Sequence, residues 1–122
     1  MTLQARLVVA GMSATEAAAD VGTVANNLTA TGTTQATAAP LGADLNRFTT
    51  VAASSGCILP AMNPGDSIQV FNAGANPLSL YPPVGGAINA LGTNAAYSIA
   101  TTTPFVNVSC ITPTQYHAMQ SA

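Results

Sequence analysis

Few side chains in this chain of 122 residues could do acid–base chemistry. The acids are Glu16, Asp20, Asp44 and Asp66, and the one histidine is His117. A Ser–His–Asp set would have to join His117 to Asp44 or Asp66 and to one of many serines. No Gly-x-Ser-x-Gly elbow marks such a serine. We therefore expect no catalytic residues and no enzyme.

The sequence also lacks residues arranged to bind a metal ion or a phosphate group. Cys57, Cys110 and His117 are too far apart in sequence to form a metal signature. Gly85-Gly86 is followed by neither a lysine nor a helix start, so it is expected to be a turn and not a phosphate loop. We expect no metal and no cofactor. The two cysteines could pair, but a reducing compartment favours free, buried thiols.

Other polar and aromatic side chains have structural explanations as well. Asp66 follows Pro64-Gly65 and is expected to accept hydrogen bonds from amides of its own turn. The tyrosines could line a sugar site, although packing in the core or at an interface is the commoner role. They are Tyr81, Tyr97 and Tyr116.

The composition points to a surface that lies against other proteins. Only 5% of the residues are charged, against roughly 25% in ordinary soluble domains. The polar positions are filled by Thr, Ser, Asn and Gln. These uncharged groups can lose their water at an interface without leaving a buried charge unpaired. We expect much of the surface to contact neighbouring subunits; the alternative is an unusual Ala/Thr-rich soluble domain.

The same composition argues against two classes of partner. Two basic residues and a net charge of −2 cannot neutralise a phosphate backbone, so nucleic-acid binding is not expected. No apolar run approaches the roughly 18 residues that span a bilayer. The apolar run behind Arg6 is too short for a signal peptide, so we expect synthesis and assembly in the cytosol.

The elements that would position these residues are short strands. Between Asn46 and Ile111, apolar residues alternate with polar ones between clusters of Gly, Pro and Asn, which is typical of antiparallel strands joined by tight turns. The pattern predicts a mainly β fold, an antiparallel β-sandwich, jelly roll or small barrel of about eight short strands. In the strand that ends at Ile111, we expect Val106, Val108 and Cys110 in the core. Further strands are predicted at residues 34–39, 45–53, 87–91 and 95–100, with an edge strand at 115–118.

The first 28 residues are expected to form an arm that can hold one short helix, and residues 29–122 the β-module. Residues 1–11 alternate like a strand or an extended arm, and Ser13–Glu16 matches a capping box. After it, Ala17, Val21, Val24 and Leu28 recur at helical spacing. The candidate assembly contacts are Leu3, Leu7, Val9, Val21, Val24 and Leu28.

A series of short motifs, in this order, resembles a small virion module of tailed bacteriophages. The resemblance covers about residues 28–111 and implies a β-rich subunit, commonly trimeric, that is attached to a phage particle; it implies no catalytic residue. The motifs are Thr34-Gln-Ala-Thr-Ala38, Asn46 with Thr49-Thr-Val-Ala-Ala53, Gly56-Cys-Ile-Leu-Pro60, Pro64-Gly-Asp66, Val70-Phe-Asn-Ala-Gly-Ala-Asn76, Leu80-Tyr-Pro82 and Gly86-Ala-Ile-Asn-Ala-Leu91.

With the low charge, the resemblance favours a capsid decoration (cement) protein. Such a protein would bind the outer surface of the phage head and stabilise contacts between major capsid subunits, as a homotrimer located in the virion and assembled in the host cytoplasm. Its partners would be the major capsid protein and copies of itself, with no nucleic acid and no membrane. The alternative is a receptor- or glycan-binding head module of a phage tail or fibre.

Overall fold

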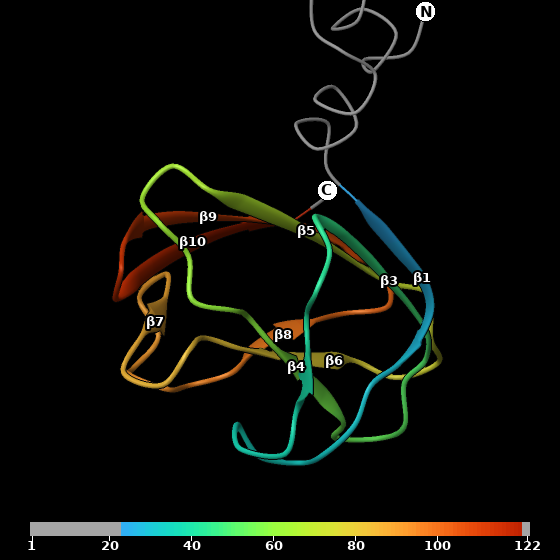
Figure 1. Ribbon diagram of the computed structural model, residues 1–122. Helices are drawn as coiled ribbons and strands as arrows, with labels where there is room; N and C mark the ends of the chain where they lie inside the picture. The colour runs from blue at the N-terminus through green and yellow to red at the C-terminus, as the bar shows by residue number, and fades with distance from the viewer. Residues whose placement is uncertain (1–22, 121–122) are drawn as a thin grey trace, which may run out of the picture.

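The computed structural model describes residues 23–120, which form ten strands in two facing sheets (Figure 1). Sheet A has the strand order β1-β3-β5-β9-β10-β7, and sheet B has the order β2-β4-β6-β8. The strands are β1 (Val24–Thr29), β2 (Ala39–Pro40), β3 (Leu45–Thr50), β4 (Gly56–Ile58), β5 (Ser67–Asn72), β6 (Leu78–Tyr81), β7 (Ala87–Ile88), β8 (Tyr97–Ile99), β9 (Phe105–Thr112) and β10 (Gln115–Gln120).

From β1 to β6 the chain winds as a coil between the two sheets. Of these six strands, the odd-numbered ones lie in sheet A and the even-numbered ones in sheet B. Each return to a sheet adds a parallel neighbour, so β1, β3 and β5 lie side by side, as do β2, β4 and β6. The rest of the chain then adds β8, β9 and β10 in antiparallel pairs.

The predicted mainly β, sandwich-like fold is confirmed, but the expectation of antiparallel pairing throughout is wrong. Five of the eight strand pairings among residues 23–120 are parallel. Alternation of apolar and polar residues shows only that one face of a strand is buried. This is equally true of parallel and antiparallel strands. The turn clusters were interpreted as hairpins, yet the one after Asn72 carries the chain from sheet A to sheet B.

Several predicted elements differ from the observed ones. Residues 34–37 form a turn in which the Thr37 amide donates to the Thr34 carbonyl (3.2 Å), so only Ala39–Pro40 remains as a strand. Pro40 does lie on an edge of sheet B, as expected for a residue without an amide donor. The strand predicted at residues 87–91 is limited to β7, and β10 lies between β9 and β7 instead of at an edge.

The C-terminal part of the predicted helix is a strand. Val24 and Leu28 belong to β1, which pairs in parallel with β3 and crosses the expected boundary between residues 28 and 29. The Asn and Thr residues of this segment have low helix propensity, and the edge of β3 supplies backbone partners. The capping box and the rest of the arm lie outside the described residues. None of residues 23–120 forms a helix long and apolar enough to cross a membrane.

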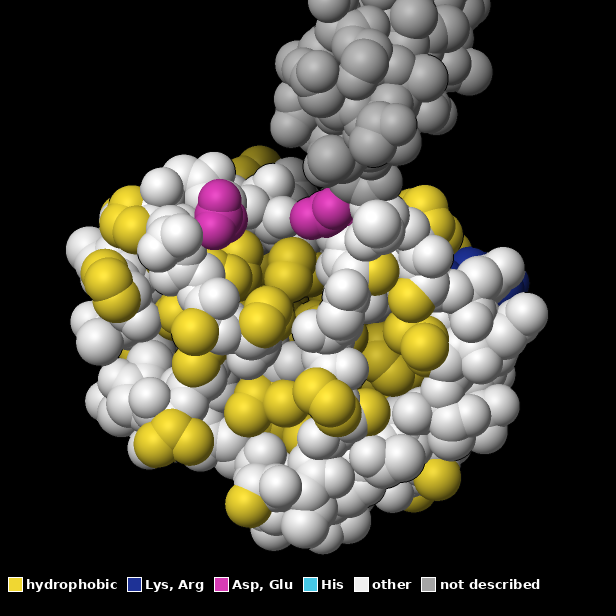
Figure 2. All heavy atoms as spheres, in the orientation of Figure 1, with side chains coloured by type: hydrophobic (Ala, Val, Ile, Leu, Met, Phe, Trp, Pro, Cys, Tyr) yellow, Lys and Arg dark blue, Asp and Glu magenta, His cyan; other side chains and the backbone are white. Residues whose placement is uncertain are grey.

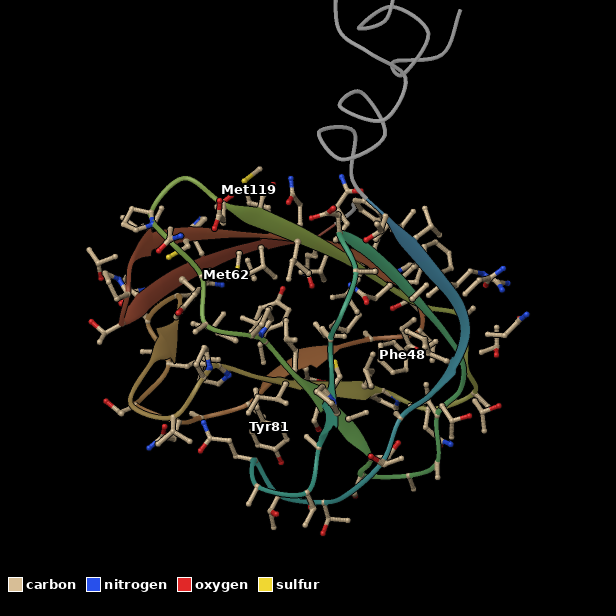
Figure 3. The ribbon with its side chains drawn as sticks, viewed as in Figure 1. Phe48, Met62, Tyr81 and Met119 are labelled. Atoms are coloured by element: carbon tan, nitrogen blue, oxygen red, sulfur yellow. The ribbon has the colours of Figure 1, made fainter. Side chains whose placement is uncertain are left out.

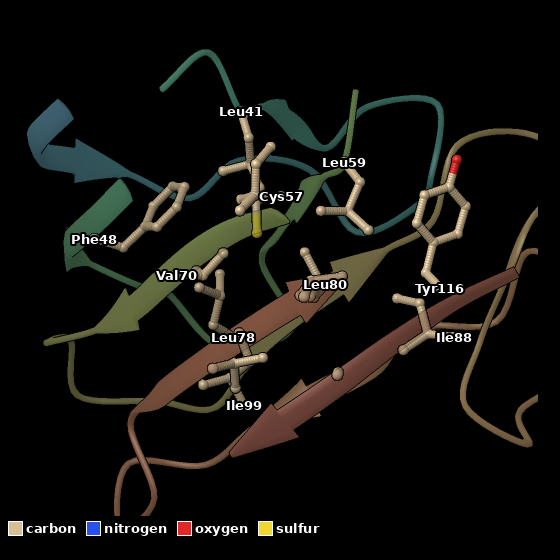
Figure 4. Packing of buried hydrophobic residues seen from close by; sticks show 14 of the residues in the cluster. Leu41, Phe48, Cys57, Leu59, Val70, Leu78, Leu80, Ile88, Ile99 and Tyr116 are labelled. Carbon is tan, nitrogen blue, oxygen red and sulfur yellow. The ribbon is translucent and has the colours of Figure 1, made fainter. Parts of the chain in front are cut away.

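The core lies between the sheets and is apolar (Figure 4). Sheet A contributes Val70, Val106 and Val108, and sheet B contributes Leu78 and Leu80. All five side chains are fully buried. The expectation that Val106, Val108 and Cys110 are core residues is confirmed. Phe48 and Tyr116 fill the larger spaces, and both are at most 1% exposed.

Buried asparagines hold the corners where the chain passes between sheets. Asn72, at the end of β5, donates through Nδ2 to the carbonyls of Asn76 (2.9 Å) and Ile99 (3.0 Å), and its Oδ1 accepts from the Gly74 amide (3.0 Å). Asn46 in β3 donates to the Ala43 carbonyl at 2.7 Å. A carboxamide both donates and accepts hydrogen bonds and carries no charge. It can therefore pair with the buried backbone groups of a corner at low desolvation cost.

Successive corners also stack closely on one another. A Cβ atom added at Gly74 would lie 2.6 Å from the Cβ of Val51, in the preceding corner. The Nδ2 of Asn76 donates to the Val51 carbonyl at 2.8 Å. Glycine at position 74 is therefore required by the approach of two turns of the coil.

Replacing Asn72 by alanine should destabilise the fold by about 2–4 kcal/mol, because the change leaves several buried backbone groups without a partner. The matched control is Asn107→Ala, since Asn107 lies in the same sheet and its Oδ1 has no hydrogen-bond partner among the described residues. The control should change stability by less than about 1 kcal/mol. Chemical denaturation measures both, and equal losses would contradict the role given to Asn72.

Candidate functional site

A groove between two carboxylates lies on the face shown in Figure 2. It consists of two adjoining hollows of about 440 Å³ and 290 Å³. Both hollows are lined by Asp44, Pro60 and Ile68. We call this feature the Asp44–Asp66 groove; its remaining lining residues are Thr23, Leu41, Gly42, Ala43, Ala61, Met62, Gly65, Asp66 and Ser67.

Each carboxylate of the groove is fixed by one backbone amide. Asp44, just before β3, accepts from the Thr23 amide at 3.0 Å through Oδ2. Asp66, just before β5, accepts from the Asn63 amide at 3.0 Å through Oδ2, which confirms that this residue binds an amide of its own turn. Both carboxylates are therefore positioned to receive a further donor from a ligand.

The segment between β4 and β5 forms one wall and is tied to β9. The Gly65 amide donates to the Cys110 carbonyl, and the Cys110 amide donates to the Asp66 carbonyl, both at 2.9 Å. Within this segment, Met62 points toward the space between the sheets and is only 9% exposed (Figure 3). The groove thus combines aliphatic side chains with polar lining groups and two carboxylate acceptors, which suits a short protein segment carrying apolar side chains and N–H donors.

The aromatic side chains do not line this groove. Tyr116 is 1% exposed and donates its hydroxyl to the Pro113 carbonyl at 3.0 Å. Tyr81 donates to the Thr33 carbonyl (3.2 Å) and Tyr97 to Oε1 of Gln120 (2.9 Å). The tyrosine hydroxyls therefore serve contacts within the fold, as the packing interpretation predicts.

His117 lies on the outer face of sheet A. Its register partner is Ser109 in β9, which in turn pairs with Ser67 in β5. Within residues 23–120, no hydrogen bond joins His117 to either serine or to a carboxylate. The same part of the chain brings no three His, Cys, Asp or Glu side chains together as metal ligands. The geometry therefore adds no support for a Ser–His–Asp set.

Both cysteines are free and buried in the structure, as the sequence analysis favoured. Cys57 lies in β4 with no exposed surface, and Cys110 is 2% exposed. The Sγ of Cys110 lies 3.5 Å from the Met62 carbonyl oxygen and can donate a hydrogen bond to it. Burial raises the pKa of the Cys57 thiol, because the thiolate would lose its hydration.

The candidate assembly contacts divide into two groups. Leu3, Leu7, Val9 and Val21 lie outside the described residues. Val24 is 69% exposed at the edge of sheet A, whereas Leu28 is half-buried against the core. The groove itself was missed, although its residues Pro60 and Asp66 belong to the turn-rich stretch that the sequence singled out. They meet Asp44 only because β3 and β5 are parallel neighbours, a pairing that turn chemistry does not encode.

The chain was compared with family models, with curated proteins and with solved structures, and it matches none of them.

Folding stability should fall as the pH rises above about 8.5, the usual pKa of a cysteine in an unfolded chain. The unfolded chain then releases the Cys57 proton, whereas the folded chain retains it, so stability that is fully present at lower pH is lost. The Cys57→Ala variant should lose less stability between pH 8 and 10. Denaturation of both proteins across this range measures the difference, and curves that run parallel would contradict the assignment to Cys57.

Proposed function

We propose that this chain is a capsid decoration (cement) protein, which binds the outer surface of a phage head and stabilises contacts between major capsid subunits. The single observation that carries the proposal is the neutral polar surface. Among residues 23–120 only Asp44, Arg47 and Asp66 carry full charges. Figure 2 shows this for one face, where the two acidic side chains border a broad area of apolar and uncharged atoms.

A neutral polar surface favours permanent contact over free diffusion. Isolated soluble proteins remain dispersed through many surface charges of both signs. Hydroxyl and carboxamide groups can instead exchange water for a partner's backbone groups without burying a charge. Several large apolar side chains are exposed as well and would contribute area to such a contact; they are Val24, Val84, Leu91, Ile111 and Met119.

We assign the Asp44–Asp66 groove to the contact with the major capsid protein. Its aliphatic side chains, among them Pro60 and Ile68, would contact an apolar side chain of a capsid loop, while the two carboxylates accept N–H donors. The protein would stabilise the shell by mass action, since a ligand that binds only the assembled lattice lowers the free energy of that lattice. Self-association as a homotrimer belongs to the proposal and rests on the resemblance.

The second candidate, a receptor- or glycan-binding head of a tail or fibre, finds some support in the acidic groove. Carboxylates commonly bind sugar hydroxyls, but the aromatic side chains on which a sugar ring would stack are engaged elsewhere in the fold. The groove lining is a mixture of aliphatic and polar groups and contains no aromatic ring. This arrangement favours a protein ligand over a carbohydrate.

Co-sedimentation of the purified protein with shells that lack it tests the proposal. Binding should saturate at a fixed, simple ratio to the major capsid protein, and the shells should gain thermal stability. Because so few charges are available, the apparent Kd should change by less than about threefold between low salt and about 0.5 M salt. Absence of binding to the shells would overturn the proposal, and binding to glycans or cell surfaces would then favour the second candidate.

Ala61→Glu should weaken binding to shells by about tenfold or more, because it places an unpaired charge in the groove at the contact. The matched control is Ala53→Glu, since Ala53 is also exposed but lies in the turn after β3 and outside the groove. The control should bind as the wild type does, and both variants should unfold at the wild-type temperature. Equal binding by the two variants would show that the groove is not the capsid contact.

A further inference from the structure

Sheet A has an outer face that points away from sheet B and from the core. Burial alternates along its strands, so that Gln69 lies between two buried residues of β5 and Asn107 between two buried residues of β9. In β10, Met119 follows the buried Ala118, and Figure 3 shows it projecting away from sheet B. Every second residue of these strands therefore contributes to the outer face.

Strand pairing aligns five outward residues in one continuous row across sheet A. Val24 pairs with Leu45, and Leu45 pairs with Gln69. Gln69 pairs in turn with Asn107, and Asn107 with Met119. We call these five residues the central row. Its two ends, Val24 and Met119, are apolar and are 69% and 65% exposed, whereas two neutral carboxamides lie side by side near its middle.

An aromatic pair lies beside the central row on the same face. Phe71 in β5 and Phe105 in β9 are register partners, with ring centroids 6.4 Å apart and ring planes inclined at 60°. Both side chains are only half-buried. The water-facing side of a sheet is commonly polar, and a contiguous apolar patch on a surface marks a contact with another molecule. The aromatic pair and the apolar row ends therefore indicate that another protein covers this face.

Asn107 has an unpaired acceptor close to the middle of the face. Its Oδ1 is buried and has no hydrogen-bond partner among residues 23–120. Buried polar atoms in native proteins are nearly always hydrogen-bonded, because an unpaired one has lost its water without replacement. The χ2 torsion of asparagine has a broad range, so a rotation of the carboxamide can turn this oxygen toward a donor on another molecule.

The size and charge of the face fit a second copy of this chain. Strands β1, β3, β5, β9 and β10 lie side by side, and with about six residues each they cover roughly 500 Å². Two such faces would bury about 1,000 Å² together, the lower limit for a specific protein interface. Arg47 is the one full charge within these described strands, and its Nη1 donates to the Asn26 Oδ1 at 3.0 Å. A copy can therefore oppose the neutral centre without bringing like charges together.

We propose that copies of this chain meet through the outer face of sheet A, each copy using this same face. Carboxamides both donate and accept hydrogen bonds, so Gln69 of one copy can donate to the Asn107 Oδ1 of another. The aromatic pair and the apolar ends of the central row exclude water around this contact. The inference rests on the self-association in the proposed function, for which it names the surface, and it leaves the Asp44–Asp66 groove to the capsid contact.

Sedimentation velocity of the full-length protein, without shells, tests this surface. Gln69→Glu keeps the shape of the side chain and adds one charge, so the dissociation constant between copies should rise roughly tenfold or more, because like charges would be buried together. The matched control is Ser98→Glu, which places the same charge at an exposed position of β8 in sheet B. The control should associate as the wild type does, and both variants should keep the wild-type circular dichroism.

A mixture of two variants tests whether the same face of each copy takes part. Gln69→Lys alone should also associate weakly, but an equimolar mixture with Gln69→Glu should associate roughly tenfold more tightly than either variant alone, because opposite charges then meet. A mixture that stays as weak as its components would overturn the proposal, since the face would then contact a different surface.

Two further outcomes separate this inference from shell binding. A wild type that sediments as a monomer, or a Gln69→Glu variant that associates as well as the Ser98→Glu control, would overturn the inference even if the protein still saturates shells at a fixed ratio. Loss of association in Gln69→Glu alone would support it even if the wild type failed to bind shells.

Discussion

The structure depends on satisfying backbone groups at the corners where the chain crosses from one sheet to the other. Asn72 meets this constraint most completely, with three hydrogen bonds that join its own corner to β8 while the side chain is 3% exposed. Asn46 and Ser55 do the same at other corners. These groups are neutral, so a coil with very few charges can still have buried polar corners without the desolvation cost of an ion.

The same coil creates the groove. Because β3 and β5 are parallel neighbours, the segments that lead into them lie at the same end of sheet A. Asp44 and Asp66 immediately precede these two strands, so parallel pairing brings two acids that are far apart in sequence to one hollow. In an antiparallel arrangement these segments would lie at opposite ends of the sheet. The feature that we assign to capsid contact is thus a consequence of strand direction.

Much of the secondary structure could be predicted from the sequence, but the topology could not. Alternation in residues 105–112 correctly placed Val106, Val108 and Cys110 in the core, since period-two burial is a local property. Direction and crossover are long-range properties, so the turn after Asn72 was interpreted as a hairpin although it is a corner. Val24 and Leu28 fit a helical stripe as well as a bulged strand, and the free edge of β3 decides between the two. The groove depends on the same non-local pairing and had no local signal.

The central claim is that this neutral, coiled β-sandwich coats a phage head. If the proposal holds, the protein is a component of phage particles, and its most direct test is its copy number in such purified particles, measured by quantitative mass spectrometry against the major capsid protein. The account predicts a fixed, simple ratio to the major capsid protein, with copies distributed over the whole shell. A copy number as low as that of a tail or fibre component would contradict it.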